Sequence, residues 1–549
     1  MTNYVIIPSA KYIASDLRKE FGHIPPVLLT YQNETILQYV HKNYRDSRIL
    51  VGLCEGKSLV EQYVRKSRLE VELVEIAQPQ TLGHTIYHLM QQIHFNELDQ
   101  MTIHFGDTIL HNVEAHTPNS ILICQVNDAW RWTTVTIHQG ELLFKDKTSI
   151  SQQDFAVVGT IHIQQPMYFR QLLCEVLTEN NTIDALFVAL EQYHREYPLQ
   201  LIEITRESWI DLGHLDRLIE ATGQTRAFNE IILDAKKGIL QKRSKNTAKF
   251  IDEILWYINL PKDLQYAVPR IFNYSIEHTN EFIEMEYYSY RSLSERYVIN
   301  NLPIEDWRLI FERISNLVEH FNQFQQQTVN IDDIRFNMYV QKTLNRLTSY
   351  DWPEVLKKVS TVEKINHIVI MPLEKILNSL ENVYSQLYQY VKHKLPKQFT
   401  IMHGDLCFSN ILYDIYNGIM RIIDPRGSFG ERSIYGDTVY DLAKLSHSVR
   451  GYYDFIIREQ FYFQEDGANI VFELFTKEHH KEIVQLFEQQ FLQDPYVKLY
   501  VDFIESMLFL SMIPLHSDAI NRQKAMLATG ILKYTQFIEQ FNKMIPLKL

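Results

Sequence analysis

One stretch of the chain predicts a β-hairpin and constrains the fold more than any other. Two short apolar segments, residues 411–414 and 419–423, lie on either side of the dipeptide Asn417-Gly418. Asn-Gly supplies the positive φ angles that a tight hairpin turn requires, so the two segments should pair as antiparallel strands. Asn410 comes just before the first strand and Asp424 just after the second. Both polar side chains should therefore meet at the open end of the hairpin.

A third polar residue, Asp405, comes five residues before Asn410, in the segment His403-Gly-Asp405. Phosphoryl transfer from ATP needs a carboxylate to orient and deprotonate a hydroxyl, and oxygen ligands for Mg²⁺. Asp405, Asn410 and Asp424 supply these groups. The competing interpretation is that His403 and Asp405 cap a turn and Asp424 caps a helix. It requires the three spacings and the hairpin to coincide by chance.

This segment resembles the aminoglycoside phosphotransferase and choline kinase family, whose pattern of His-Gly-Asp, four residues and Asn it matches in full. The resemblance implies an α+β, protein-kinase-like domain of two lobes that acts on small molecules. It also implies that Asp405 is the catalytic base, that Asn410 and Asp424 bind Mg²⁺, and that His403 shapes the loop. For Asp441, which precedes Leu-Ala further on, we expect an N-cap or a brace for the loop.

A kinase of this kind also needs a strand lysine that holds the ATP phosphates and a helix glutamate that orients it. Lys242 lies in a strand-like segment, and Glu253 lies in the helical segment 246–258 that ends before Pro261. We expect these two to pair. The neighbours Arg243 and Asp252 remain alternatives, because a shift of one residue in either element exchanges them.

Two further segments are expected to contact ATP. Residues 284–288, Glu-Met-Glu-Tyr-Tyr, resemble the hinge between kinase lobes and include Met285. Residues 225–229 lie where the phosphate loop is expected and include Arg226 and Asn229. This loop has no glycine, a departure that small-molecule kinases of the family often make.

The N-terminal third resembles a second family, the sugar nucleotidyltransferases. The first strand, residues 4–8, and the strand that ends in Gly106-Asp107 fit its pattern, as does the segment Ser-Trp-Ile-Asp211-Leu-Gly. The resemblance implies an α/β, Rossmann-like domain in which Asp107 and Asp211 bind Mg²⁺. Two carboxylates suit nucleotidyl transfer, because Mg²⁺ neutralises the triphosphate while a phosphate attacks it. The chain departs from the family where a glycine-rich loop is expected, at residues 11–22, and where Pro25-Pro26 replaces Pro-Lys. Lys11, Arg18 or Lys19 could replace the missing charge.

Composition excludes several classes of protein. With 46% apolar and 22% charged residues the chain is typical of folded proteins, and at 549 residues it is long enough for several cores. The net charge of −13 opposes binding to nucleic acid. No apolar stretch reaches the ~20 residues of a membrane helix, so we expect no membrane insertion. Four scattered cysteines without a C-x-x-C pair favour a reducing, cytoplasmic compartment. The oligomeric state is not predicted.

Together these features predict three parts: a nucleotidyltransferase-like domain over residues 1–222, a kinase-like N-lobe over 223–300, and a helical C-lobe with the catalytic loop over 301–549. We expect a bifunctional enzyme. Its kinase would use ATP and Mg²⁺ to phosphorylate a hydroxyl of a sugar or small amino-alcohol. The N-terminal domain would join that phosphate to a second NTP, CTP or UTP, to make an activated precursor of a surface polysaccharide.

Three alternatives stay open. The N-terminal domain could be an inactive sugar- or nucleotide-binding module beside a working kinase, because the expected glycine-rich loop is missing. The kinase could act on protein, although Asp424-Pro-Arg-Gly stands where protein kinases have Asp-Phe-Gly. The acceptor is also open: Arg426 and Arg432 favour an anionic or polyhydroxy substrate, whereas the 32 tyrosines permit an aromatic cage for a quaternary ammonium.

Overall fold

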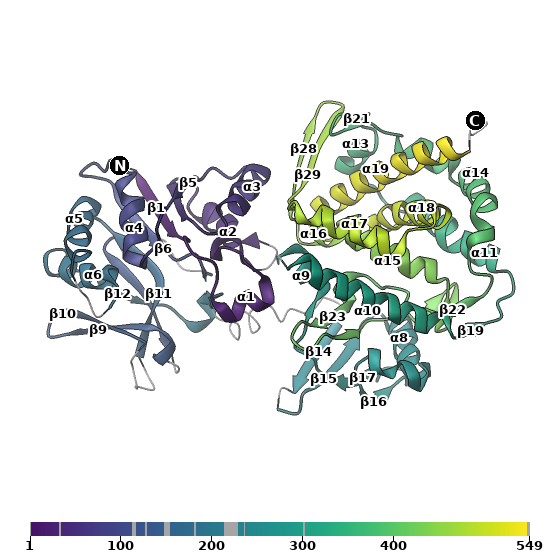
Figure 1. The fold of residues 1–549 in the computed structure, drawn as a ribbon, viewed down its shortest axis with the longest axis horizontal. Coiled ribbons are helices and arrows are strands. Elements are labelled where there is room, and N and C mark those ends of the chain that lie inside the picture. The colour runs from purple at the N-terminus through teal and green to yellow at the C-terminus, as the bar shows by residue number, and fades with distance from the viewer. Residues whose placement is uncertain are drawn as a thin grey trace. The chain divides into compact units, whose positions relative to one another are not determined.

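The structure is a computed structural model that describes residues 2–31, 34–111, 117–126, 129–147, 154–179, 183–213, 229–234, 236–299 and 302–545. The chain divides into two compact units, Met1–Gly223 and Gln224–Leu549. Figure 1 shows both units.

Unit 1 is built on a mixed β-sheet. Its four parallel strands follow the order β6-β1-β4-β5, and β11 pairs antiparallel with β6, β8 and β9. The strands are β1 (Asn3–Pro8), β4 (Arg48–Leu53), β5 (Glu72–Glu75), β6 (Gln100–His104), β8 (Ser120–Val126), β9 (Thr133–His138), β10 (Glu141–Asp146), β11 (Asp154–Ile163) and β12 (Gln200–Glu203). The parallel strands are connected through helices, as parallel pairing requires.

The main core of unit 1 lies between this sheet and three helices, α4 (Leu82–Gln91), α5 (Pro166–Val176) and α6 (Ala185–Glu196). Every second strand residue faces these helices, for example Met101 and Ile103 of β6, because side chains alternate along a strand. The residues between them, Thr102 and His104, face the other side of the sheet, where α2 (Ile36–Asn43) lies. This sheet confirms the α/β fold class.

Unit 2 begins with a small antiparallel lobe. Four strands pair in the order β14-β15-β17-β16, and one helix, α8, follows β15. Their bounds are β14 (Asn229–Asp234), β15 (Ile239–Ser244), β16 (Ile271–Ser275), β17 (Phe282–Glu286) and α8 (Thr247–Asn259). In Figure 1 this lobe lies at one end of the unit.

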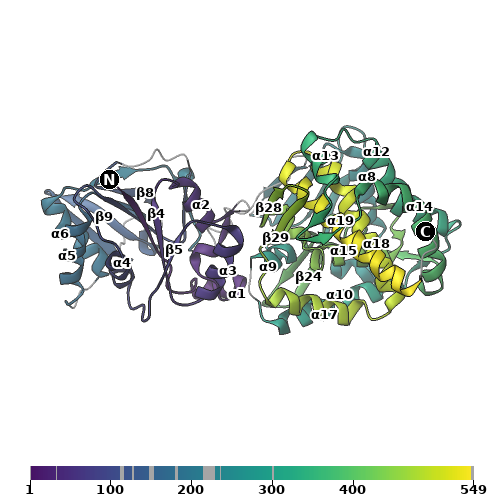
Figure 2. The same ribbon diagram turned by 90° about the horizontal axis from the view of Figure 1, so that it is seen from above.

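The rest of unit 2 is mainly helical, and α15, α18 and α19 lie at its centre in the views of Figures 1 and 2. The helices are α9 (Leu293–Val298), α10 (Ile304–Asn322), α11 (Ile331–Phe336), α12 (Lys342–Thr348), α13 (Glu354–Ser360), α14 (Leu373–Val391), α15 (Thr438–Val449), α16 (Tyr453–Ile457), α17 (His479–Phe491), α18 (Pro495–Met512) and α19 (Ile520–Met544). A small antiparallel lobe followed by a helical lobe confirms the two-lobed fold class. No helix among the described residues is both long and apolar enough to cross a bilayer.

One part of the helical lobe contains strands that the sequence pattern did not predict. The strands β28 (Phe461–Asp466) and β29 (Asn469–Leu474) form a hairpin, which pairs with the short strand β20 (Lys364–Ile365).

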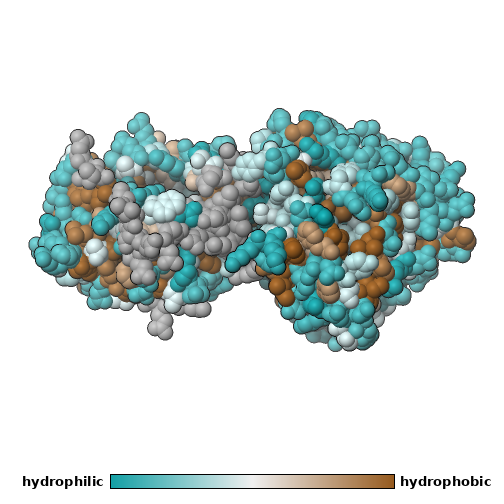
Figure 3. Space-filling view, turned by 90° about the horizontal axis from the view of Figure 1, so that it is seen from below, coloured by the Kyte–Doolittle hydropathy of each residue, from teal (hydrophilic) through white to brown (hydrophobic). Residues whose placement is uncertain are grey.

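On the face drawn in Figure 3, hydrophilic residues cover most of the surface and hydrophobic residues form small separate groups.

Candidate active sites

The predicted hairpin is present in unit 2. Strands β23 (Ile411–Asp414) and β24 (Ile419–Ile422) pair antiparallel, with Gly418 in the turn at φ +62°. The Ile423 N–H donates to the carbonyl of Asn410 at 2.9 Å, which brings the two ends together. Asp424 follows with a left-handed φ of +57°, a conformation that costs a non-glycine residue about 1–3 kcal/mol and that is enriched at functional sites.

Asp405 lies between two polar partners. One carboxylate oxygen is 2.7 Å from Lys444 Nζ, and the other accepts a hydrogen bond of 3.0 Å from Asn410 Nδ2. The side chain remains about one-third exposed, at 34%. The carboxylate is thus fixed in orientation and still reachable by a substrate.

Asp441 braces the loop that carries Asp405. Its carboxylate accepts the backbone N–H groups of His403 and Gly404 at 2.6 and 2.8 Å, and burial raises its pKa to about 7. The brace was one of the two roles expected for Asp441; the other, the N-cap of α15, belongs to Asp437. Burial also lowers the pKa of His403 to about 4, so its ring is neutral near pH 7, and its Nε2 lies 3.0 Å from the carbonyl oxygen of Ile423.

Lys242 and Glu253 form an ion pair between β15 and α8. Lys242 Nζ is 2.7 and 3.0 Å from the two oxygens of Glu253 and 2.8 Å from Asp424 Oδ1. Burial raises the pKa of Glu253 to about 7, although Lys242 opposes the change. Burial alone would lower the pKa of Lys242, but Asp424 and Glu253 outweigh it and raise that pKa.

The neighbouring residues that remained alternatives point elsewhere. Arg243 lies 3.5 Å from Asn280 and over the ring of Phe282, and Asp252 forms an ion pair with Arg432. In the described part of the chain the lysine and glutamate of the pair are therefore Lys242 and Glu253.

The loop after Asp424 packs directly against α8. The Asp424 N–H donates to the hydroxyl of Tyr257 at 3.1 Å. Gly427 has φ +66°, and a Cβ there would lie 2.0 Å from the backbone oxygen of Asp252, so only glycine fits. The Arg432–Asp252 ion pair adds a third contact.

Of the three other residues expected to contact ATP, the structure describes Met285 fully and Asn229 in part. Met285 lies in β17, buried opposite Leu240 of β15, one residue before the end of the strand. Asn229 begins β14, and its side chain lies outside the described residues, as does all of Arg226.

Lys444 is a site residue that the sequence analysis missed. It is buried at 8% exposure, and although burial lowers its pKa, Asp405 outweighs this and the net pKa is raised, which keeps it charged. A signal was available: Lys444 follows Asp441 by three residues, and on a helix such as α15 this spacing puts both side chains on one face, which here meets the catalytic loop.

In unit 1 the structure brings Asp107 and Asp211 together. Strands β7 (Thr108–Leu110) and β13 (Trp209–Asp211) pair so that Asp211 faces Thr108. A Cβ placed on Gly213 would lie 2.7 Å from an oxygen of Asp107 and 3.1 Å from one of Asp211. The pair lies beyond the carboxyl end of β6, next to the end of parallel strand β1, where α/β sheets commonly bind ligands.

The segment where a glycine-rich loop is expected has another structure. It contains a helix, α1 (Ser15–Phe21), and the Tyr12 N–H before it donates to the carboxylate of Glu55 at 2.7 Å. Among the possible replacement cations, Lys11 Nζ contacts the Gln80 carbonyl at 3.2 Å, Arg18 is exposed on α1, and the side chain of Lys19 lies outside the described residues.

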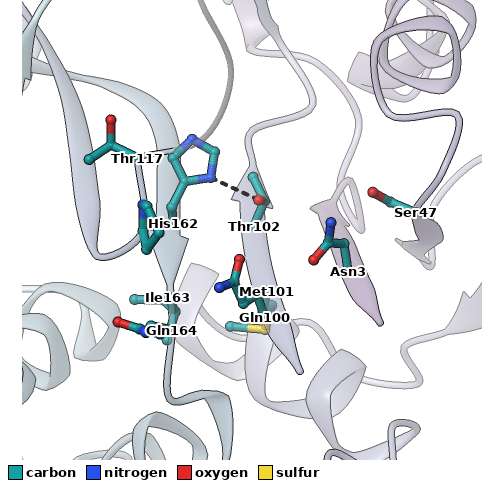
Figure 4. Close-up of a pocket in the computed structure, with 10 residues that line it drawn as sticks. Asn3, Ser47, Gln100, Met101, Thr102, Thr117, His162, Ile163 and Gln164 are labelled. Carbon is teal, nitrogen blue, oxygen red and sulfur yellow. Dashed lines mark hydrogen bonds between the residues drawn. The ribbon is translucent and has the colours of Figure 1, made fainter. Parts of the chain in front are cut away.

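Two cavities lie in unit 1. The one in Figure 4, of about 60 Å³, is at the amino ends of β1 and β6, near the hydrogen bond between Thr102 and His162, and so lies at the sheet edge opposite the aspartates. A larger one, of about 730 Å³, lies between the sheet and α2 and is lined by His104, Thr160 and Tyr44 among others.

No family model matches the chain, and no curated protein matches it in sequence. Solved structures are similar to parts of it. A CTP:phosphocholine cytidylyltransferase from Streptococcus pneumoniae is 11% identical, with 40% of this chain and 97% of that chain covered and a TM-score of 0.33. A choline kinase from Streptococcus pneumoniae is 15% identical over 58% of this chain and 92% of that chain, with a TM-score of 0.32. A mutant aminoglycoside 2'-phosphotransferase IIIa bound to GDP is 13% identical over 58% and 91%, with a TM-score of 0.36. These are the kinds of protein that the sequence motifs resemble, but TM-scores below 0.5 support no inference about activity.

Proposed function

We propose that unit 2 is an ATP-dependent kinase that phosphorylates a hydroxyl group of a small molecule. The observation that carries the proposal is a single connected set of contacts. Lys242 bonds both Glu253 and Asp424, Asp405 bonds Asn410, and the Ile423 N–H next to Asp424 bonds the Asn410 carbonyl and so links the two groups. Kinases use these groups for phosphoryl transfer. In each of the contacts named, the two side chains are within hydrogen-bonding distance of each other in the absence of a ligand.

Each group has a role in the transfer. Lys242, oriented by Glu253, binds the phosphates of ATP. Asp405 accepts the proton of the acceptor hydroxyl while the hydroxyl oxygen forms a bond to the γ-phosphorus and the bond to ADP breaks. Neutral His403 and the carboxylate of Asp441 hold the loop, so Asp405 loses little freedom on binding substrate.

Mg²⁺ is expected with ATP, and the residues present fit it. Asn410 and Asp424 offer an amide oxygen and a carboxylate, the hard oxygen ligands that Mg²⁺ prefers, at adjacent ends of the hairpin. When bound, the ion neutralises charge that develops on the phosphates.

For unit 1 we propose nucleotidyl transfer, in which the phosphate made by unit 2 attacks the α-phosphate of a second nucleotide, CTP or UTP, and pyrophosphate leaves. The pairing of Asp107 and Asp211 beside Gly213 supports this, since two carboxylates can share a metal ion. The product would be an activated precursor of a surface polysaccharide, and we propose that the enzyme makes it in the cytoplasm.

The second candidate is a kinase joined to a binding module without activity. Two observations favour it. The amide of Tyr12, in the segment that should cradle a triphosphate, is already bonded to the negative side chain of Glu55. The cavity of about 730 Å³ is also large enough for a sugar or nucleotide, as ligand cavities measure about 300–1,000 Å³.

One experiment with the full chain tests both proposals. ATP consumption is measured with sugars, alditols, choline and ethanolamine, and pyrophosphate release is then measured after each NTP is added with the phosphorylated acceptor. ADP formation that requires both an acceptor and Mg²⁺ supports the kinase. If no NTP releases pyrophosphate, unit 1 is a binding module.

A further inference from the structure

A group of basic side chains surrounds one buried tyrosine beside the catalytic loop. Lys342 Nζ lies 5.5 Å from the centre of the Tyr440 ring, and the Arg426 guanidinium donates to the Tyr440 hydroxyl at 3.2 Å. Arg346 is one turn after Lys342 on α12, and Lys444 is one turn after Tyr440 on α15, so each shares a helix face with its partner. We call Lys342, Arg346, Arg426 and Lys444 the basic cluster.

The charge of this cluster is largely uncompensated. Lys444 pairs with Asp405, but within the described parts of the chain no carboxylate forms an ion pair with Lys342, Arg346 or Arg426. The chain as a whole carries a net charge of −13, so acidic side chains are plentiful elsewhere. Half-buried cations normally have a partner, because removing a charge from water is costly.

The surrounding residues hold the cluster in place. Buried Arg335 of α11 forms an ion pair with Asp437, the N-cap of α15, and Tyr339 donates to the same carboxylate at 2.8 Å. A π-helical turn, Asn337–Gln341, then leads into α12. Such a turn contains an extra residue and so rotates the helix after it, and π turns are frequent at functional sites. Here it precedes Lys342, while the Tyr339 ring stacks 6.0 Å from Tyr440.

Two members of the basic cluster, Lys444 and Arg426, contact the loop that carries Asp405. One oxygen of Asp405 bonds Asn410, on the metal side, and the other bonds Lys444, on the cluster side. Arg426 is also close to the loop: its backbone N–H donates to the His403 carbonyl at 2.8 Å, and its Cβ would lie 2.7 Å from a Cβ on Gly404. Lys242, which we propose binds the ATP phosphates, instead contacts Glu253 and Asp424.

We infer that the acceptor of the kinase carries an anionic group, a carboxylate or a phosphate, which Lys342, Arg346 and Arg426 bind while Asp405 engages its hydroxyl. This inference rests on the proposed kinase function and specifies its substrate class. It also opposes a quaternary ammonium acceptor, since a cation would meet like charges where it needs carboxylates or ring faces.

Electrostatics around Tyr440 agree with this assignment. Burial by itself raises the pKa of Tyr440, but Lys342, Arg426 and Lys444 outweigh it and lower that pKa to about 8. Burial, with Arg426 and Arg346 nearby, lowers the pKa of Lys342 to about 8. A field that favours a phenolate also favours an anionic ligand.

Calorimetry on the full chain with Mg²⁺ and a non-hydrolysable ATP analogue tests the inference without requiring turnover. The probes are matched pairs: glycerate and glycerol, glucuronate and glucose, and glycerol 3-phosphate and glycerol, with choline as the cation. We expect at least one anionic probe to bind roughly tenfold or more tightly than its neutral partner. Lys342→Met and Arg426→Gln should each remove about tenfold of that preference.

Controls separate the two proposals. Lys357→Met removes an exposed lysine that pairs with Glu354 on α13, so it should leave the preference unchanged. Thermal unfolding checks that the variants fold. Neutral or cationic probes that bind as tightly as the anions, or a preference that survives both substitutions, would overturn the inference. If the unaltered chain does not bind the ATP analogue, the kinase proposal is refuted. The preference for anionic over neutral probes would then still be measured from the binding of the probes without the analogue.

Discussion

The two candidate sites differ in how far they are assembled before any ligand binds. In unit 2 the carboxylates proposed for catalysis and for metal binding already touch cations: Asp405 bonds Lys444, and Asp424 bonds Lys242. Groups fixed in this way need little reorganisation when phosphate charge moves, and preorganisation of this kind is usually the largest source of catalysis.

In unit 1 the carboxylates are together, but the segment expected to bind phosphate bonds to the protein itself. The Tyr12 N–H would have to release Glu55 before it could bind a triphosphate oxygen. Pairing of β7 with β13 is enough to place the two carboxylates together. A phosphate-binding loop requires more, namely backbone N–H groups that are not already bonded to the protein. The comparison therefore separates a candidate site whose charged groups are already paired from one whose two aspartates lie together while the expected phosphate-binding segment bonds within the protein.

The sharpest test of the comparison is Asp405→Asn. The variant keeps the size of the side chain and loses the base, so kinase activity should fall by about 10²–10⁴. With phosphorylated acceptor supplied, pyrophosphate release by unit 1 should be unchanged. A folded variant with near-normal ATP-dependent phosphorylation would remove Asp405 from the mechanism.

The matching test in unit 1 is Asp107→Asn. If Asp107 and Asp211 share a metal ion, the loss of one carboxylate should reduce pyrophosphate release about 100-fold, because metal stabilisation amounts to several kcal/mol. Kinase activity, measured by ADP formation, serves as the control. Equal pyrophosphate release in both proteins would show that the pair is structural.

Lys444→Met should have an intermediate effect. Asp405 would lose one of its two partners, so we expect kcat to fall about tenfold while the KM for ATP changes little. Removal of the cation should also move the acidic limb of the kcat pH profile to higher pH, because a nearby positive charge favours the ionised carboxylate. Lys444→Arg should restore part of the rate. A merely structural lysine would change stability and leave the pH profile in place.

The pH dependence of acceptor binding should show a smaller effect. Lys342, with a pKa of about 8, is charged below that pH and neutral above it, and Tyr440 becomes negative above about pH 8. Arg346, Arg426, Lys444 and Asp405 are the other charged groups that face Lys342 and Tyr440. The KM for an anionic acceptor should therefore rise several-fold from pH 7 to 9, whereas that of a neutral acceptor should not.

The smallest effect is expected from separating the units. We propose that each folds alone, so a fragment starting at residue 224 should be soluble and keep kinase activity within about twofold of the full chain. Circular dichroism and ADP formation measure this. Aggregation of fragments starting at several nearby residues would show that the two halves depend on each other.

Local sequence patterns predicted much of the kinase site. The Asn-Gly turn and the spacing of Asp405, Asn410 and Asp424 lie within about twenty residues, and hairpin pairing alone brings them together. Lys242 and Glu253 are also neighbours along the chain, joined by one strand and one helix. Periodicity and turn chemistry act over such distances, so the sequence is informative there.

The rest depended on long-range packing. Lys342 lies beside Tyr440 after a π turn that leads into α12, and the Arg335–Asp437 ion pair joins α11 to α15; no local pattern encodes either feature. The sequence pattern did not predict helix α1 where a glycine-rich loop was expected. Nor did it predict the bond between the Tyr12 N–H and Glu55, which lies some forty residues later in the chain. The strands β28 and β29 were not predicted, because the spacing of their apolar residues is also compatible with a helix.

The close packing of Gly427 against α8 has a consequence for control of the kinase. Many protein kinases are switched off when the helix with the glutamate swings away from the loop with the metal-binding aspartate. Here the backbones lie close at Gly427, the Asp424 N–H bonds Tyr257, and Arg432 pairs with Asp252, so movement of one element alone would break all three contacts. In the proposed kinase these three contacts would oppose an inactive position of this kind. Its output would follow the supply of its acceptor and the amount of protein made, as suits a step that commits a small molecule to a single pathway.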